Sequence, residues 1–428
     1  MYLDLKRSDL ALNGGQPVRT VPWLDNFTTG DEEKDAVIRV LDSGYLSKFE
    51  GSHTPDPPFS FYGGPEVQAL EREWSEYYGY KHSISVNSAT SGLYAAIGAI
   101  GVGYGDEVIV SPYTMTACAM APLLFGAIPV FSDVEKETGC MDVESIERVL
   151  SNRTKAILVV HQFGIPADMG KIMELAKQHD LKVIEDCAQA HGAKYNNKYV
   201  GTFGSIGVFS LNVNKSIQTG EGGICITDDE ELAYRLALIR NHGEAVVGPA
   251  KYENVVNIFG FNFRLTELQA AIAREQLKKI DKLNDHRLDL VEAFSCGLEN
   301  HPFLHPLSGR PGCYSTYYVY PLRYEFGISG VEREEFVAAL NAEGALFYQG
   351  YVEPLYLQPL YQQQSLFKHS YPFSAPENRG HTARYEKGTC SVAELLHEKT
   401  MIINEHIRFP HQKRDIEQLI QIVIKVTG

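Results

Sequence analysis

The sequence lacks any uncharged apolar run long enough to span a bilayer. Its first residues, Met1–Asp9, lack the apolar core of a secretory signal peptide. An excess of basic residues is also missing, because 39 Lys and Arg stand against 54 Asp and Glu, for a net charge of -15. That balance argues against nucleic acid or an anionic membrane as the main partner. These absences favour a cytoplasmic protein.

Several motifs of known chemistry are missing as well. The seven cysteines form no C-x-x-C pair, which suits a reducing compartment better than a disulfide framework. The fourteen histidines include no H-E-x-x-H, and His406 and His411 lack partners at ligand spacing, so we expect no metal. No G-x-S-x-G elbow is present. Gly101–Gly105 resembles a dinucleotide fingerprint, but it follows a predicted helix and precedes a strand, so it reads as a turn.

The 428 residues, 44% hydrophobic and 22% charged, are enough for one large and one small domain. Strand and helix patterns alternate from about 83 to 240, which predicts a mostly parallel central sheet flanked by helices on both faces. A fresh pattern starts near 315, with a strand expected over 317–322. We therefore expect an α/β fold with a large domain over 1–300 and a smaller C-terminal α/β domain over 301–428.

One lysine stands in an unusual setting. The apolar run Ile206–Leu211 predicts a buried strand, and Lys215 follows it, just before the glycine-rich stretch Gly220–Gly223. Glycines there allow tight turns and close backbone approach. A lysine held within a core is costly unless it is paired or neutral, and a neutral lysine can form a Schiff base. The alternative is a surface lysine on a loop.

Small polar residues, Asn87–Gly92, stand between a predicted strand and the helix that follows it. Backbone N–H groups at a helix N-terminus bind anions, with help from the helix dipole. The alternative is simple capping of the helix by Ser88 or Thr90.

Another predicted strand ends in Glu185 and Asp186. Neighbouring strand residues face opposite ways, so only one carboxylate can point into a pocket. Such a carboxylate can hold a protonated ring nitrogen and make a heterocycle an electron sink. The alternative is an aspartate that caps the following turn. Paired carboxylates of the glycosidase kind are disfavoured by this geometry.

A Schiff-base lysine, an anion seat and an acidic partner for a ring nitrogen together match the binding pattern of pyridoxal 5'-phosphate, PLP. From about Gly44 to the C-terminus, the chain resembles the DegT/StrS family of sugar aminotransferases. Members of that family have the aspartate aminotransferase-like PLP fold type I. The resemblance rests on Gly64–Val67, Gly105–Val110, Ile184–Gly192, the Lys215 segment and Gly260–Ala271.

The resemblance implies a role for each matching residue. Lys215 and Asp186 would be catalytic, the first as the Schiff-base residue and proton shuttle, the second as the partner of the pyridine nitrogen. Gln189 would lie against the cofactor's hydroxyl side, and Met115 falls where the family usually stacks an aromatic ring. Asn262 would reach the phosphate of the neighbouring subunit's cofactor, which implies a homodimer. The phosphate of the chain's own cofactor would be seated by Ser88, Ala89, Thr90 and Ser210.

The implied reaction moves an amino group from glutamate or glutamine to a nucleotide-linked keto sugar or a keto-cyclitol, in aminosugar, polysaccharide or antibiotic biosynthesis. One rival is a PLP-dependent sugar dehydratase, but family members of that kind replace the lysine with histidine, whereas Lys215 is present. A second rival is a non-catalytic, PLP-binding regulatory homologue, against which the intact Asp186 and Lys215 pair speaks. A desulfurase or aldolase of the same fold type is disfavoured by the segments around Asn262 and Gly220–Gly223.

Two segments resist assignment to regular elements. Residues 1–30 look irregular, and the loop 49–62 is rich in Pro, Gly and aromatic residues. Long loops inside compact domains are usually functional or mobile. We expect loop 49–62 to help shape the acceptor pocket, and the alternative is a packed surface loop that covers the dimer seam.

Overall fold

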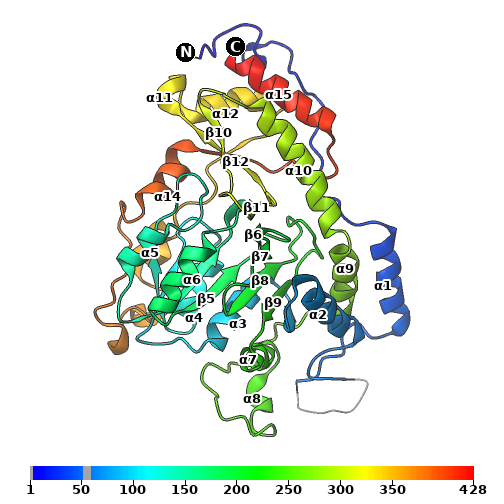
Figure 1. The fold of residues 1–428 in the computed structure, drawn as a ribbon, viewed down its shortest axis with the longest axis vertical. Coiled ribbons are helices and arrows are strands. Elements are labelled where there is room, and N and C mark those ends of the chain that lie inside the picture. Colours follow the sequence, from blue (N-terminus) through cyan, green and yellow to red (C-terminus); the bar gives the residue numbers. More distant parts are fainter. Residues whose placement is uncertain (1–2, 52–58) are drawn as a thin grey trace.

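The structure, a computed structural model, describes residues 3–51 and 59–428 (Figure 1). Its centre is a seven-stranded sheet. Strands β2, β3, β4, β5 and β8 run parallel, while β9 is antiparallel to both of its neighbours, so the mostly parallel sheet is confirmed. In spatial order the strands are β1 (His82–Val86), β9 (Gly223–Thr227), β8 (Ile206–Ser210), β5 (Lys182–Asp186), β4 (Thr154–Val160), β2 (Glu107–Val110) and β3 (Ile128–Phe131).

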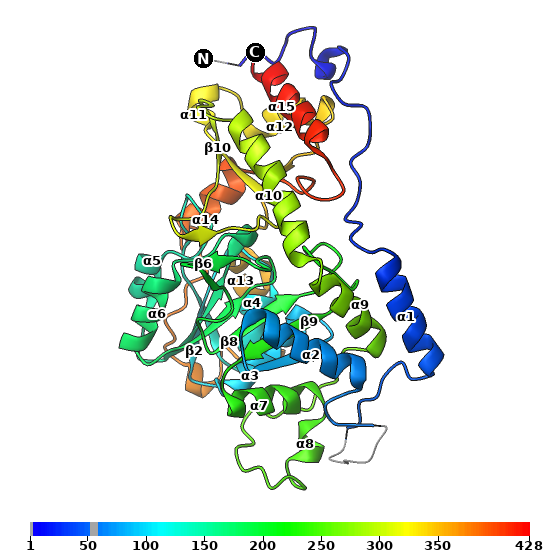
Figure 2. The same cartoon turned by 45° about the vertical axis from the view of Figure 1, so that its right-hand side comes forward.

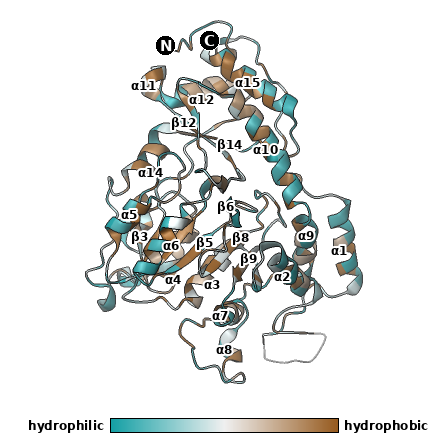
Figure 3. Ribbon diagram, in the orientation of Figure 1, coloured by the Kyte–Doolittle hydropathy of each residue, from teal (hydrophilic) through white to brown (hydrophobic). Residues whose placement is uncertain are grey.

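Helices cover both faces of this sheet. On β8, Val208 packs in the cluster that contains α3 (Ala89–Ala99), whereas the next residue, Phe209, packs in the cluster that contains α2 (Pro65–Tyr78). Strands buried on both faces need apolar residues at every position, which explains the continuous apolar runs in the sequence. Figure 3 shows these strands as hydrophobic and α2 as largely hydrophilic. The other helices of this part are α1 (Asp31–Ser43), α4 (Ala117–Leu124), α5 (Val143–Val149), α6 (Met169–Gln178), α7 (Glu230–Arg240), α8 (Gly243–Val246) and α9 (Glu267–Leu277).

A second core lies around a four-stranded antiparallel sheet, in the order β10-β12-β14-β13, packed against α12 and α15. A small third sheet joins β11, β6 and β7. The bounds are β6 (Lys194–Tyr195), β7 (Lys198–Tyr199), β10 (Leu304–Pro306), β11 (Cys313–Tyr314), β12 (Tyr320–Tyr324), α11 (Phe326–Ser329), α12 (Arg333–Ala342), β13 (Tyr348–Gln349), α13 (Pro359–Gln363), α14 (Ser391–Leu395), β14 (Met401–Asn404) and α15 (Lys413–Thr427).

The long helix α10 (Ile280–Gly297) runs from the large core toward the small one (Figures 1 and 2). Its residues Leu290, Val291 and Phe294 pack in the second core, and the later segment 355–396 contributes side chains to the large core. The division into 1–300 and 301–428 stays a prediction. The strand expected over 317–322 begins later, at Tyr320, because Tyr317 takes a positive φ of 46° that no strand residue adopts.

Part of loop 49–62 lies outside the described residues, which omit 52–58. At its two ends, Phe49 and Ser60 form an isolated parallel bridge. Phe61 is buried, whereas Tyr62 is exposed. The prediction that this loop shapes the acceptor pocket therefore remains a prediction. In the described parts of the chain, no helix has both the length and the apolar character needed to cross a membrane.

Candidate active site

Lys215 lies just beyond β8, in the connection that Gly220, at φ +80°, turns back toward β9. Its side chain is 8% exposed, and Nζ lies 4.2 Å from the centre of the Tyr318 ring. Within the described residues, no carboxylate oxygen lies within ion-pair distance of Nζ. Burial lowers the pKa of this amine to about 8, although the charges of Asp186 and Glu405 act in the opposite direction. The amine is therefore partly neutral near physiological pH, as a nucleophile requires.

Asp186, at the end of β5, is one of the two carboxylates whose charges act on Lys215. Its Oδ1 accepts the backbone N–H of Ala188 at 2.9 Å, so the turn-capping role is real. Its Oδ2 accepts only the S–H of Cys118, at 3.2 Å, and a thiol is a weak donor. This oxygen therefore has room for a strong donor such as a protonated ring nitrogen.

The expected anion seat lies at the N-terminus of α3. The Ser88 hydroxyl accepts the Ser91 N–H at 3.0 Å, so this side chain caps the helix, as the alternative proposed. The first backbone N–H groups of the helix, at Ala89 and Thr90, have no intrahelical partner and point outward. Gly223 of β9 packs directly beneath them, since a Cβ there would lie 2.7 Å from Ala89 N. The glycine-rich segment thus allows the predicted close approach of two backbones at the seat.

Of the other predicted site residues, two are buried and two are exposed. Ser210 is buried at the end of β8, and its Oγ accepts the Asn212 N–H, which leaves its own hydrogen to donate. Gln189 is buried and binds Phe163 N through Oε1 and the Tyr351 hydroxyl through Nε2. Met115 is 53% exposed. The Asn262 side chain is exposed, and its backbone carbonyl accepts Asn87 Nδ2, one residue before Ser88 of the same chain.

Sequence reasoning missed the residues that close the site from the C-terminal part of the chain. Tyr318 contacts Lys215, and Tyr351 binds Gln189. Burial raises the pKa of Tyr318 to about 12, so its hydroxyl stays neutral. Both tyrosines lie in irregular segments more than a hundred residues from Lys215, and no local pattern singled them out. The aromatic run Tyr317–Tyr320 predicts a strand, whereas in the structure only Tyr320 of this run belongs to one.

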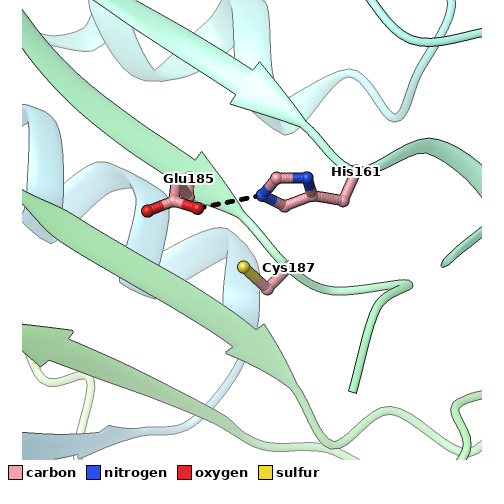
Figure 4. A group of neighbouring side chains, drawn as sticks. All are labelled: His161, Glu185 and Cys187. Atoms are coloured by element: carbon pink, nitrogen blue, oxygen red, sulfur yellow. Dashed lines mark hydrogen bonds and ion pairs between the residues drawn. The ribbon is translucent and has the colours of Figure 1, made fainter. Parts of the chain in front are cut away.

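A buried cluster of His161, Glu185 and Cys187 lies behind the site (Figure 4). Glu185 Oε2 accepts His161 Nε2 at 3.0 Å and Gly201 N at 2.7 Å. Its Oε1 accepts the backbone N–H groups of Phe203 and Gly204. The four acceptor positions of this carboxylate are therefore filled by protein donors, and the cluster serves as a hydrogen-bonded support for β5.

The residues present fit PLP. A buried amine with a lowered pKa, a carboxylate oxygen with only a thiol donor, and a helix N-terminus held open by Gly223 match the aldehyde, ring nitrogen and phosphate of that cofactor. These groups follow the carboxyl ends of β8, β5 and β1, and ligands bind beyond such strand ends in open α/β sheets.

Comparison with known proteins agrees with this chemistry. A model of the DegT/DnrJ/EryC1/StrS aminotransferase family matches residues 59–377. The L-glutamine:2-deoxy-scyllo-inosose aminotransferase of Streptomyces kanamyceticus is 33% identical over 85% of each chain. The dTDP-3-amino-3,4,6-trideoxy-alpha-D-glucose transaminase of Streptomyces venezuelae is 35% identical over 80% of this chain and 84% of its own. The crystal structure of S. venezuelae DesV in complex with a ketimine intermediate is 29% identical, with a TM-score of 0.77, over 93% of this chain and 95% of its own.

Proposed function

The chain belongs to the DegT/DnrJ/EryC1/StrS aminotransferase family, and from that premise we propose that it moves an amino group from glutamate or glutamine to a keto sugar or a keto-cyclitol. It is a PLP-dependent aminotransferase of fold type I. The observation that carries the proposal is Lys215, a buried amine whose pKa lies near 8 and on which the charge of Asp186 acts. Relatives that act on a cyclitol and on a dTDP-sugar support both acceptor classes.

In this proposal each residue has a defined task. When bound, PLP supplies an electron sink that stabilises negative charge at the donor's α-carbon. Lys215 Nζ would take the proton from that carbon and deliver it to C4′ of the cofactor, and would move a proton in the opposite direction when the keto acceptor reacts. Both transfers suit a pKa near the working pH. Asp186 Oδ2 would accept the ring N–H, and Gln189 would lie against the hydroxyl side of the ring. The N–H groups of Ala89 and Thr90, with the Ser210 hydroxyl, would hold the phosphate, while Ser88 caps the helix.

Reduction with borohydride tests the assignment. In the presence of PLP, reduction followed by peptide mapping should attach the cofactor to the peptide that contains Lys215, and to no other lysine. Lys215→Ala should take up no label and should lose several orders of magnitude in rate, because nucleophile and proton carrier are one residue. A label on another lysine in the wild-type protein would refute this assignment.

We also propose a homodimer with shared active sites. The Asn262 side chain is exposed, so it is available to a neighbouring subunit's phosphate. Mixing Lys215→Ala with Asn262→Ala chains under full subunit exchange should restore one native site per heterodimer. If each variant alone is inactive and the mixture stays inactive too, the sites are built within one chain. A cytoplasmic location completes the proposal, supported by seven cysteines that are all free thiols.

A further inference from the structure

One side chain of the N-terminal segment holds the backbone at the reactive lysine. Asn26, 8% exposed, donates from Nδ2 to the carbonyl of Val213 at 3.0 Å and to that of Lys215 at 2.8 Å. In the part of the chain that the structure describes, no backbone N–H donates to either carbonyl. The two carbonyls that enclose Asn214 and Lys215 are therefore both held by Asn26.

The N–H groups of the same two residues bond inside the turn instead. Val213 N donates to the carbonyl of Gly220, and Lys215 N donates to that of Asn212, each at 2.9 Å. The turn is thus closed on its N–H side and depends on Asn26 on its carbonyl side. A buried carbonyl that loses its donor costs free energy, so without Asn26 we expect the turn to shift until these carbonyls reach another donor or water.

The segment that carries this asparagine, residues 24–28, is called the strap below, and it is anchored at both ends. At its start, the N–H of Leu24 donates to His411 Nε2 at 3.0 Å. At its end, Thr28 Oγ1 donates to Gln276 Oε1 at 2.7 Å, and Gln276 Nε2 donates to the carbonyl of Thr28 at 2.9 Å. Because both ends are fixed, the amide between them has little freedom to follow a movement of the turn.

The place of the amine depends on this backbone. Lys215 Nζ lies 4.2 Å from the centre of the Tyr318 ring, on a long side chain with many rotamers, so it stays buried only if its own backbone is fixed. A displacement of about 1 Å at a reacting group can cost about 10²-fold in rate. Resting on the proposed function, in which Lys215 is the reactive residue, we propose that Asn26 is a positioning residue that keeps the Lys215 amine buried in the active site.

The variant Asn26→Leu tests this without changing a charge. Leucine has nearly the shape of asparagine but donates no hydrogen bond. The titratable groups that act on Lys215 or bind its neighbours all remain in this variant: Asp186, His191, Arg287, Tyr318, Glu405 and Arg408, with Asp25 of the strap acting on Arg408. A changed proton affinity of Lys215 in Asn26→Leu would therefore report a changed burial of the amine.

Competitive labelling with acetic anhydride, followed by peptide mapping, measures the pH at which Lys215 becomes nucleophilic in the full-length, cofactor-free chain. The wild-type midpoint should lie at about 8. In Asn26→Leu it should rise above about 9, toward the usual value of a lysine, because the released amine regains water. The matched control is Thr28→Val, which removes a buried hydrogen bond of the strap that does not touch Lys215, and it should keep the wild-type midpoint.

The PLP-loaded enzyme gives a second readout. In single-turnover absorbance measurements with saturating glutamine, Asn26→Leu should lower the rate by about 10²-fold, whereas Thr28→Val should change it by less than about 3-fold. Both variants lose buried hydrogen bonds, so both should melt at a lower temperature than the wild type. Asn26→Ser, which keeps one donor for the two carbonyls, should recover part of the rate.

Two results would overturn the inference. One is a Lys215 midpoint in Asn26→Leu that equals the wild-type midpoint, and the other is an equal loss of rate in Asn26→Leu and Thr28→Val. Either would show that Asn26 only supports the fold. The labelling needs neither cofactor nor donor, so its outcome does not depend on the reaction. If borohydride attaches PLP to another lysine of the wild type, it is the proposed function that fails.

Discussion

Two adjacent carboxylates, one on each face of β5, differ in the hydrogen bonds that they accept. Glu185 accepts four strong hydrogen bonds from His161 and three backbone N–H groups. Asp186, the next residue, accepts one backbone N–H and one weak thiol. Both are buried, so burial does not separate them. They differ in the number and strength of their donors, and the carboxylate with fewer donors, Asp186, is the one whose charge acts on the reactive lysine.

Among substitutions on the two faces of β5, Asp186→Asn should give the largest effect, a loss of rate with little loss of stability. Asparagine keeps an oxygen for the Ala188 N–H, so the fold should change by no more than about 1 kcal/mol. Its amide cannot hold a protonated ring nitrogen, so the rate should fall on the order of 10³-fold. Steady-state kinetics and a urea melt of the same preparation measure the two effects. Comparable losses of stability and activity would show that Asp186 supports the fold as Glu185 does, and would contradict this prediction.

Glu185→Gln should show the reverse pattern. The amide cannot accept from all four donors, so a buried N–H loses its partner, at a cost of about 3 kcal/mol in the free energy of unfolding. Urea unfolding measures this loss. For the fraction that remains folded, kcat should stay within about 10-fold of the wild-type value, because Glu185 touches no reacting atom. An unchanged melt would show that the four hydrogen bonds are not what supports β5.

The burial of Lys215 should also be measurable as a pH dependence of the free energy of unfolding. The pKa of Lys215 is about 8 in the folded chain, against its usual 10.5, so the unfolded chain binds more protons between these values. Stability from this group therefore rises with pH from about 8 to 10.5 and is lost as pH falls. In the absence of cofactor, the free energy of unfolding of the wild type, relative to that of Lys215→Met, should rise by about 2 to 3 kcal/mol across that window. Parallel curves for the two proteins would mean that the amine is not desolvated.

The smallest effect is expected at Met115, which is half exposed and which the sequence resemblance predicts to stand where the family usually has a stacked ring. Met115→Phe should tighten PLP binding by about 2- to 10-fold, since an aromatic contact adds about 0.5 to 1.5 kcal/mol. Fluorescence titration of the cofactor-free protein measures this. Weaker binding would show that Met115 does not lie against the ring.

The sequence was informative where chemistry follows regular strands. The apolar runs before Asp186 and Lys215 predicted buried strands, and the glycines before β9 predicted the close approach that Gly223 makes with Ala89. What it could not provide were contacts made across the fold. Tyr318 contacts Lys215, and Arg408 donates to the carbonyl of the preceding residue, Asn214, both from irregular segments whose neighbours are fixed only by tertiary packing. The hydrogen-bond donors to Glu185 and Asp186 could not be predicted either, because they include residues 118, 161 and 201–204, which only the fold brings close.

The N-terminal segment has a consequence for synthesis of the chain. It runs along one side of the molecule from the small core to α1 (Figure 1). On the way, Arg19 pairs with Asp415 of α15, and Asn26 donates to the carbonyls of Val213 and Lys215. On the ribosome Arg19 emerges long before its anchor, because Asp415 lies 396 residues further along the chain. The segment that supports the backbone of the reactive lysine is therefore held at Arg19 only after α15 has been made, so a chain interrupted before α15 lacks this anchor.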